Sequence, residues 1–499
     1  MINATKEFLK ETDDLFEARK AEIRNTTDNL EIKGTTYYVS TSGDDKNDGL
    51  TPETAWRTLE KVSSAYLYEG DGVLFKRGDL FRGGVKTVSG VTYGAYGEGA
   101  KPEFRGCFEN LAYPEAWTEV DAEHHIWKYV KPILDPGTLV FNEGEAHSIK
   151  LIPSYRDLKF VCRDDESRVF EMKNEMVRDL DIFWKYDKLL HRNPTKGEDF
   201  PVPQIGGDSF GELFLRCDKG NPGEVFNSIE AVVRRVAFAV GSNHDVTIDN
   251  ICMKYFLFGV SAGGFCVEGL TVTNCEIGWI GGNIQHYNGT DPNYPQGRRG
   301  TVTRFGNGIE IYGGCDRYTV SNCYIYQSYD AAVTHQITTS TKRTLTNIHY
   351  ANNLIETCVY GVEYFLDQIQ GESESYMDNV LMEGNFIRLG GYGWGQQRHN
   401  TDTPALIKGW SYVNTARNYA IRNNIFDRCA YRMLHLVAKK DEYCPEMSDN
   451  TFIQNEGGMI GQYGGNENGE PDVLIFDENA EKKINEVFGD KSAKVYIIK

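Results

Sequence analysis

The sequence predicts an all-β protein, a right-handed parallel β-helix, on two observations. Short segments with alternating apolar residues return between about residues 245 and 465, and each centres on an asparagine. A second strand-like segment follows most of these asparagines by nine to eleven residues, and helical periodicity is missing throughout this stretch. Stacked parallel strands, with one coil to each repeat, account for both observations.

The repeat has a near-constant minimum length with an irregular excess. Successive asparagines are 24, 48, 31, 32, 39 and 26 residues apart, as expected for solenoid coils that carry inserted loops. Asparagine tolerates left-handed backbone and forms hydrogen bonds along its own stack, which suits a tight bend between strands. The seven asparagines are Asn250, Asn274, Asn322, Asn353, Asn385, Asn424 and Asn450.

Five parts of the chain are expected. Residues 1–30 have the pattern of an amphipathic helix, which we expect to cap an open end of the solenoid, and residues 31–105 form the first coils. Residues 106–235 lack the asparagine repeat but contain strand-like runs with NPG and KG turns, which predicts a small β-rich insertion. Residues 236–465 form the main β-helix with long loops on one face, and residues 466–499 form a C-terminal tail or cap.

Composition and charge restrict the kinds of molecule that the protein is expected to bind. The formal net charge of −19 disfavours nucleic acid, and it favours neutral over acidic ligands unless basic residues cluster locally. No apolar run approaches the roughly 18 residues needed to cross a bilayer, so no membrane partner is expected. Eleven cysteines without a secretory signal pattern predict free thiols and a cytoplasmic location. The oligomeric state is left open.

Three stretches near the start of the chain resemble a known superfamily. The segment YYVSTSGDDKNDGLTPETAWRTLEKV, followed by GDGVLFKRGDLFRGGV and VTYGAYGEGAKPEF, is similar to the opening of bacterial pectate-lyase-like β-helix proteins. The resemblance covers this opening and the asparagine repeats, and it is specific for the fold. That superfamily includes glycoside hydrolases, polysaccharide lyases, epimerases and phage tailspikes, so the resemblance implies a carbohydrate-active β-helix and leaves the reaction open.

One outer face of the coils is expected to gather carboxylates. Side chains alternate along a strand, so the residue after each inward apolar residue points outward. Loops expected at residues 281–305, 336–343, 365–376 and 396–414 would form walls beside this face. The predicted outer column consists of Ser261, Glu310, Thr334, Glu363, Gly395, His435 and Gly461.

The acidic residues of this face suit glycoside hydrolysis. That reaction needs one carboxylic acid to protonate the leaving oxygen and one carboxylate to attack or to activate water. Asp330 stands just before the outer-column strand, on the rung between Glu310 and Glu363. We therefore predict Asp330 and Glu363 as the catalytic pair and Glu310 as a third participant. Which group is the acid, and whether the anomeric configuration is retained, is left open.

Residues around the column are candidates for binding the sugar. Aromatic faces pack against sugar rings, and clustered polar side chains form hydrogen bonds with hydroxyl groups. For His335 and Trp394, burial in the core is the competing interpretation. The candidates are His335, His435, Trp394, Gln397, Arg398, His399 and Trp410.

The predicted function is a glycosidase that releases units from the end of a neutral oligosaccharide, without a metal or other cofactor. A polysaccharide lyase is one alternative, which would use calcium and an arginine or lysine base. The predicted column contains neither residue type, although Arg398, Arg422 and Arg432 keep this alternative open. A sugar-binding β-helix without catalytic activity is the other. The sugar and its linkage are left open.

Overall fold

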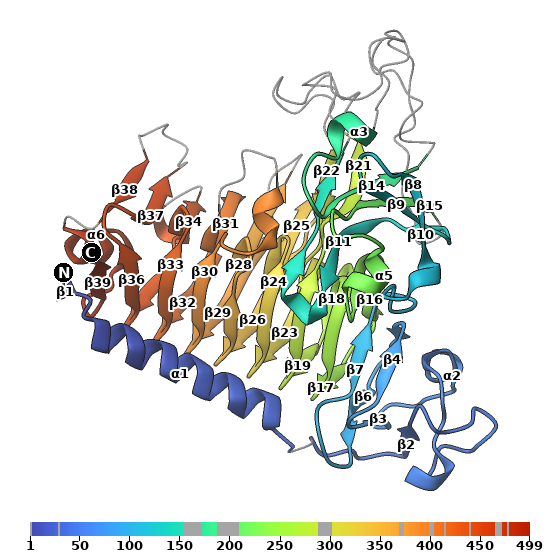
Figure 1. Cartoon of the computed structure of the whole chain (residues 1–499). Coiled ribbons are helices and arrows are strands. Elements are labelled where there is room, and N and C mark those ends of the chain that lie inside the picture. Colours follow the sequence, from blue (N-terminus) through green and yellow to red (C-terminus); the bar gives the residue numbers. More distant parts are fainter. Residues whose placement is uncertain are drawn as a thin grey trace.

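The predicted right-handed parallel β-helix is confirmed by a computed structural model, in which 31 strands join one continuous sheet (Figure 1). The coil has three faces, which we number in the order in which the chain passes through them. The structure describes residues 2–27, 30–152, 172–186, 209–287, 302–368, 374–398, 404–413, 416–438, 441–464, 472–476 and 479–499.

The first face is a ladder of parallel strands that ends at the C-terminal coil. Strand β18 is long enough to turn the corner from this face onto the second. The ladder contains β4 (Leu80–Arg82), β7 (Glu103–Arg105), β18 (Cys252–Glu268), β20 (Glu276–Ile280), β24 (Tyr324–Ser328), β27 (Leu354–Glu356), β30 (Phe386–Gly390), β33 (Ile425–Cys429), β36 (Thr451–Asn455) and β39 (Lys494–Ile498).

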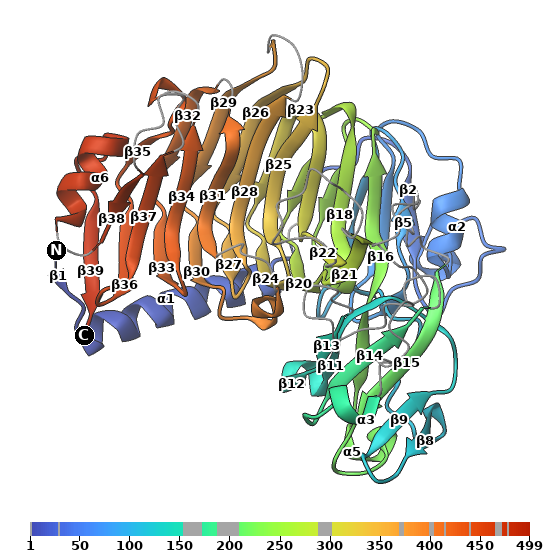
Figure 2. The ribbon, with the colours of Figure 1, turned by 90° about the horizontal axis from the view of Figure 1, so that it is seen from above.

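The second face carries the predicted outer column, and Figure 2 shows most of its strands side by side. One further strand, β38 (Val473–Ile475), adds to its end in antiparallel orientation. The parallel strands are β5 (Val85–Lys86), β16 (Ile229–Gly241), β18, β23 (Ile309–Ser321), β25 (Ala331–Thr339), β28 (Tyr360–Gln368), β31 (Ala405–Val413), β34 (Arg432–Ala438) and β37 (Met459–Gly464).

The third face closes the coil and leads back to the first. It contains β2 (Thr36–Val39), β3 (Gly72–Lys76), β6 (Thr92–Tyr96), β17 (Thr247–Asp249), β19 (Thr271–Thr273), the end of β23, β26 (Thr344–Ala351), β29 (Tyr376–Glu383), β32 (Ala416–Arg422) and β35 (Glu446–Ser448). Apolar side chains from all three faces fill a single core along the axis.

The asparagines that mark the repeat occupy two neighbouring positions in the bend between the third and first faces. Asn250, Asn274 and Asn322 have positive φ angles, which this residue type adopts more easily than most. The later asparagines lie one position further along, where each side-chain amide donates to the next coil at 2.9–3.1 Å. This buried ladder runs through Asn353, Asn385, Asn424 and Asn450 and ends on Asp490.

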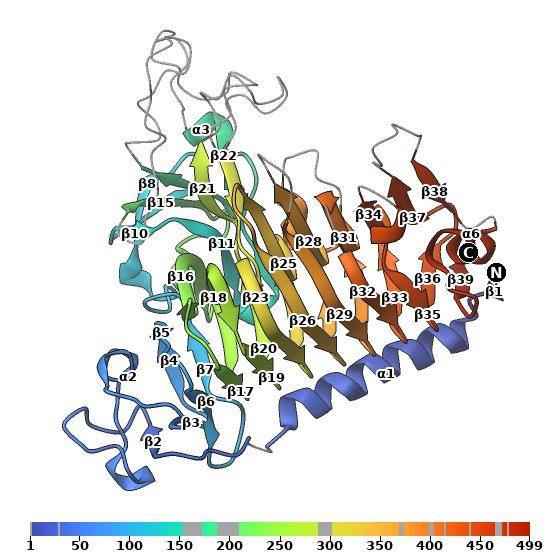
Figure 3. The same cartoon turned by 180° about the vertical axis from the view of Figure 1, so that it is seen from behind.

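The N-terminal helix forms as predicted, but it lies along the solenoid and does not cover an open end. Helix α1 (Lys6–Asn25) crosses the coils lengthwise beside the first face (Figure 3). Its Phe16 packs against Tyr324 and Phe386, and its Arg24 forms an ion pair with Glu276 at 2.7 Å. The C-terminal coil is covered by a different helix, α6 (Ala480–Phe488), whose buried side chains join the core.

The 106–235 region contains a separate six-stranded sheet with its own core. One of its remaining strands, β11 (Pro136–Phe141), pairs antiparallel with β16 and so ties the region to the solenoid. The strands of the sheet are β8 (Trp117–Asp121), β9 (Ile126–Tyr129), β10 (Ile133–Leu134), β13 (Ile149–Leu151), β14 (Asp181–Lys185) and β15 (Phe210–Arg216).

Three excursions leave the coils at the same corner, between the first and second faces. The inserted sheet lies between β7 and β16 of this path. A hairpin of β21 (Asn283–Tyr287) and β22 (Val302–Phe305) lies between β20 and β23. A short 3-10 helix, η6 (Trp394–Gln397), lies between β30 and β31. The corner therefore has walls built from segments far apart in the sequence.

Candidate active site

The strand register places five of the predicted residues in one outer column on the second face. Ser261 pairs with Glu310, Thr334 pairs with Glu363, and the column continues to His435. Strand β23 pairs in parallel with β25 in the register that sets Glu310 opposite Thr334. Because rungs are about 4.8 Å apart, Glu310 and Glu363 stand about 10 Å apart along the backbone.

Two positions of the predicted column are wrong. Gly395 belongs to η6 at the corner, and the strand that pairs with β28 begins only at Ala405, so Lys408 takes the place beside Glu363. At the last parallel rung, Gln462 takes the place predicted for Gly461, because Gln462 is the residue that pairs with His435. The column thus contains a lysine, which removes the sequence-based argument against a basic group at this site.

Glu310 is held by the residue that ends the hairpin excursion. Asn307 donates from its side-chain amide to Glu310 Oε2 at 2.7 Å, while its carbonyl oxygen accepts from the backbone N–H of Ala331 at 2.9 Å. The second bond fixes which end of the Asn307 amide faces the carboxyl group, so a donor is always presented to Glu310.

Asp330 sits at the corner, in the single turn between β24 and β25. It forms an ion pair with Arg398, the residue that follows η6. The Arg398 guanidinium also lies over the ring of Tyr360, 5.6 Å from its centroid. Asp330 is only 7% exposed, so the corner excursion covers it.

Glu363 and Lys408 form a buried ion pair on adjacent rungs. The Lys408 Nζ lies 3.2 Å from Glu363 Oε1, and both side chains are less than a tenth exposed. The same ammonium group lies 3.8 Å from the centroid of the Tyr360 ring. The ammonium group thus contacts both the carboxyl group and the face of the tyrosine ring.

The three carboxyl groups influence one another. Burial is the main cause that raises the pKa of Glu310 to about 7; the Asn307 hydrogen bond opposes this rise, and the negative charges of Asp330 and Glu363 add to it. Burial also raises the pKa of Asp330 above its ordinary value, against the Arg398 charge. Near neutral pH the site can therefore supply a proton from Glu310 beside two carboxyl groups that are paired with cations, the division of roles that acid–base catalysis requires.

Two of the predicted sugar-binding residues lie in the interior. His335 points into the core, where it is stacked on Tyr364 and is bonded to the hydroxyl groups of Tyr350 and Tyr419 at 2.9 and 3.2 Å. Burial lowers its pKa to about 3, so it stays neutral. Trp394 is fully buried and donates to the carbonyl of Gln327. The structure gives both a packing role in place of the predicted contact with sugar.

The polar residues of the corner excursion have separate partners. Gln397 forms hydrogen bonds with the inserted sheet: its amide donates to the Ser148 carbonyl at 2.8 Å, and its carbonyl accepts from the Lys150 N–H at 3.2 Å. His435 is partly exposed in the column and lies 2.9 Å from Arg432. His399 lies outside the described residues, as does the side chain of Trp410.

Sequence reasoning missed Lys408 and Asn307. A signal for Lys408 existed, because ALIKGW alternates in the same way as the other strands of the face. Nothing in the sequence marks Asn307, whose role depends on the hairpin returning to the coil beside Ala331.

Within the described residues, no group of three or more metal-ligating side chains is placed to hold an ion. In the same part of the chain, no helix has the length and apolar character to cross a membrane.

Comparisons with known proteins give distant structural likenesses only. No family model and no curated protein matches the chain. A GH136 lacto-N-biosidase from Eubacterium ramulus has 13% identity and a TM-score of 0.39, over 92% of this chain and 70% of that one. A structure described as a glycoside hydrolase has 10% identity and a TM-score of 0.41, over 93% and 96%.

An alginate lyase from Paenibacillus sp. str. FPU-7 has 9% identity and a TM-score of 0.37, over 93% of this chain and 99% of that one. Hydrolases and lyases thus occur side by side at similar scores. All three TM-scores lie below 0.5, so the likeness carries no argument about the reaction of this chain.

Proposed function

We propose that this chain is a glycoside hydrolase whose acid and base stand on the second face. The observation that carries the proposal is the cluster of three carboxyl groups, two of which are paired with cations. Among the described residues Glu310 has no cation beside it, and its pKa of about 7 allows it to hold a proton near neutral pH, whereas Glu363 is paired with Lys408. An enzyme that cleaves a glycosidic bond needs a proton donor and a second carboxyl group at once.

The proposed reaction assigns one task to each group. Glu310 gives its proton to the glycosidic oxygen as the bond to the anomeric carbon breaks. Glu363 takes a proton from a water molecule that attacks the anomeric carbon from the opposite side. The separation of about 10 Å between their rungs leaves room for this water and favours inversion. Asp330, held by Arg398, accepts a hydrogen bond from a sugar hydroxyl.

We propose a neutral sugar unit at the point of cleavage. With Glu310 protonated, two carboxyl groups are paired with two cations there, so the described part of the site has no unpaired positive charge to offer an acidic ring. The low exposure of Asp330 and Glu363, 7% and 6%, favours the end of a chain over the middle of a polymer. Release of single units or short fragments from an oligosaccharide end is the expected mode, and no metal is needed for these steps.

The test is hydrolysis of aryl glycosides and short oligosaccharides by the parent chain and matched variants. Glu310→Gln and Glu363→Gln are expected to lose at least a hundredfold in rate, because each removes one proton transfer. Glu446→Gln, an exposed glutamate on the third face, is the control and should keep the parent rate. Full activity in both site variants would contradict the assignment.

The anomer formed first gives a second, independent readout. Proton NMR during the first turnovers should show inversion if Glu310 and Glu363 are the pair. Retention would instead point to Asp330 as one member of a closer pair, as expected from the sequence alone.

A polysaccharide lyase is the second candidate, and a specific observation favours it. Lys408 in the column and Arg398 at Asp330 supply the basic groups that the predicted column lacked. A lyase would release an unsaturated product that absorbs in the ultraviolet, and chelators would abolish the activity if calcium took part. Binding of sugar without any product would indicate a non-catalytic β-helix.

A further inference from the structure

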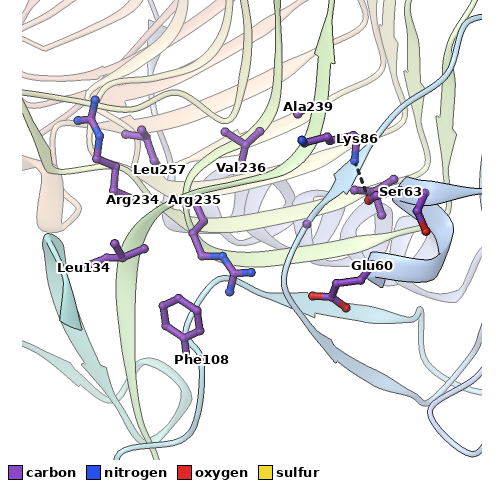
Figure 4. Close-up of a pocket in the computed structure, with 13 residues that line it drawn as sticks. Glu60, Ser63, Lys86, Phe108, Leu134, Arg234, Arg235, Val236, Ala239 and Leu257 are labelled. Atoms are coloured by element: carbon purple, nitrogen blue, oxygen red, sulfur yellow. Dashed lines mark hydrogen bonds between the residues drawn. The ribbon is translucent and has the colours of Figure 1, made fainter. Parts of the chain in front are cut away.

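A cavity lies beside the first strands of the second face, apart from the carboxyl cluster. It has a volume of about 840 Å³ and lies where α2 (Leu59–Ser64), the first coils and the inserted sheet meet (Figure 4). Its apolar surface comes from Leu134, Val236, Ala239 and Leu257. The ring of Phe108 stands at its border and is 49% exposed.

The charged groups of this cavity are mostly basic. Lys86, Arg234 and Arg235 line it against a single carboxylate, Glu60, in a chain whose net charge is −19. Arg235 is fixed by a hydrogen bond to the Gly106 carbonyl at 3.1 Å. Such a local excess of cations is what an anionic ligand requires.

The guanidinium of Arg235 is stacked on a ring, so its position is set before any ligand arrives. It lies 4.5 Å from the centroid of Phe108, and the guanidinium of Arg234 lies 5.2 Å from that of Phe305. Lys86 is exposed, and among the described residues its ammonium has no ion-pair partner. It is therefore the cation most available to a ligand.

The register connects this cavity to the carboxyl cluster. Lys86 pairs with Ala239, Ala239 with Ser261, and Ser261 with Glu310. Lys86 therefore stands in the same outer column, three rungs or about 14 Å from Glu310. A short oligosaccharide lying along the second face would reach both places.

We propose that this cavity binds an anionic sugar unit, bearing a carboxylate or a sulfate, of the glycan whose neutral unit lies at Glu310. The inference rests on the proposed function for the identity of the ligand as a glycan. Lys86 and Arg235 bind the anionic group through charge-assisted hydrogen bonds. The guanidinium of Arg234 points away from them, donates to the Ile284 carbonyl, and adds its positive charge from the border of the cavity (Figure 4). Phe108 offers its exposed ring to the sugar face.

Calorimetric binding tests the proposal without turnover, in the Glu363→Gln background. The probes are tri- to pentasaccharides that end in glucuronate, their carboxyl-reduced counterparts that end in glucose, and a sulfated series. The acidic forms are expected to bind about tenfold more tightly than the reduced forms at low salt. The two acidic series show whether carboxylate or sulfate is preferred.

Lys86→Gln should remove most of this preference, and Lys86→Gln with Arg235→Gln all of it. Lys76→Gln, an exposed lysine on the third face, is the matched control and should keep it. Equal binding of acidic and reduced probes, or a preference that survives the double variant, overturns the proposal.

The two proposals fail in different ways. A preference for acidic probes in a chain that hydrolyses nothing supports this cavity and contradicts the hydrolase. Hydrolysis of neutral glycosides without any acidic preference supports the hydrolase and contradicts this cavity.

Discussion

Replacement of Glu310 by glutamine should stabilise the protein at high pH and leave its stability unchanged at low pH. The folded protein holds the Glu310 proton more tightly than the unfolded chain, because burial and neighbouring carboxylates raise its pKa from 4.5 to about 7. The free energy of unfolding therefore falls as pH rises from about 4.5 to about 7. Glutamine has nearly the same shape as glutamate, and its carbonyl oxygen still accepts the hydrogen bond from Asn307. Because it cannot ionise, the folded variant does not lose stability at this position as the pH rises.

The size of the effect follows from the pKa. Each pKa unit corresponds to about 1.4 kcal/mol, so the rise from 4.5 to about 7 corresponds to about 3.5 kcal/mol at most. Burial is the largest cause, and the charges of Asp330 and Glu363 contribute smaller parts. For Glu363, whose rung is about 10 Å from that of Glu310 along the backbone, the repulsion at an effective dielectric constant of 20 is about 1.7 kcal/mol at most.

The assay is urea denaturation of the parent and Glu310→Gln at several pH values between 4.5 and 8.5. The difference in unfolding free energy should grow with pH and level off above about 7. In a Glu363→Gln background the growth should shrink by up to half. A difference between parent and variant that does not change with pH would refute the account of a proton held at Glu310.

Three further outcomes are expected. The rate of the proposed hydrolysis should fall above about pH 7, where Glu310 loses its proton, and a rate that rises through this range would contradict its role as the acid. Gln397→Ala should lose about 1–2 kcal/mol of stability by removing two hydrogen bonds to the inserted sheet, and it should slow turnover, whereas the exposed Gln396→Ala should do neither. Asn424→Ala should lower the free energy of unfolding by about 2–4 kcal/mol, because it interrupts the buried ladder and leaves the partner amide without its acceptor, and an unchanged denaturation midpoint would contradict this role.

The fold could be predicted because its signal repeats. Each coil returns the same apolar alternation, so an error in one coil is corrected by the next. Side chains alternate between the two faces of a strand, and this alternation does not depend on the lengths of loops elsewhere. It therefore correctly predicted one outer column that contains Glu310, Thr334, Glu363 and His435.

The prediction of the outer column is wrong at the point where the chain leaves the coil. Counting from an asparagine gives the next strand only if the corner is short, and the excursion before Ala405 includes a 3-10 helix. Gly395, predicted in the column, therefore lies in this helix, and Lys408 takes its place beside Glu363. The contact between Gln397 and the backbone at Ser148 joins positions 249 residues apart, and no local pattern indicates such a pairing.

The N-terminal helix shows the same limit. Its buried Phe16 and Ile23 lie on the same stripe of the helix, about two turns apart, so an apolar face could be predicted. The surface that this face meets is built by coils hundreds of residues later, such as Phe386. Helix propensity and apolar periodicity predict a helix and its apolar face, but they do not predict which surface that face packs against.

The path of α1 joins coils that are far apart in the sequence. Ile2 of β1 (Ile2–Asn3) pairs with Tyr496 of β39 at the C-terminal coil. Along the helix, Asp13 forms an ion pair with Arg428, and Arg24 forms one with Glu276. The helix therefore acts as a brace along the solenoid, and a coil in this span that unfolds also gives up its contacts with α1.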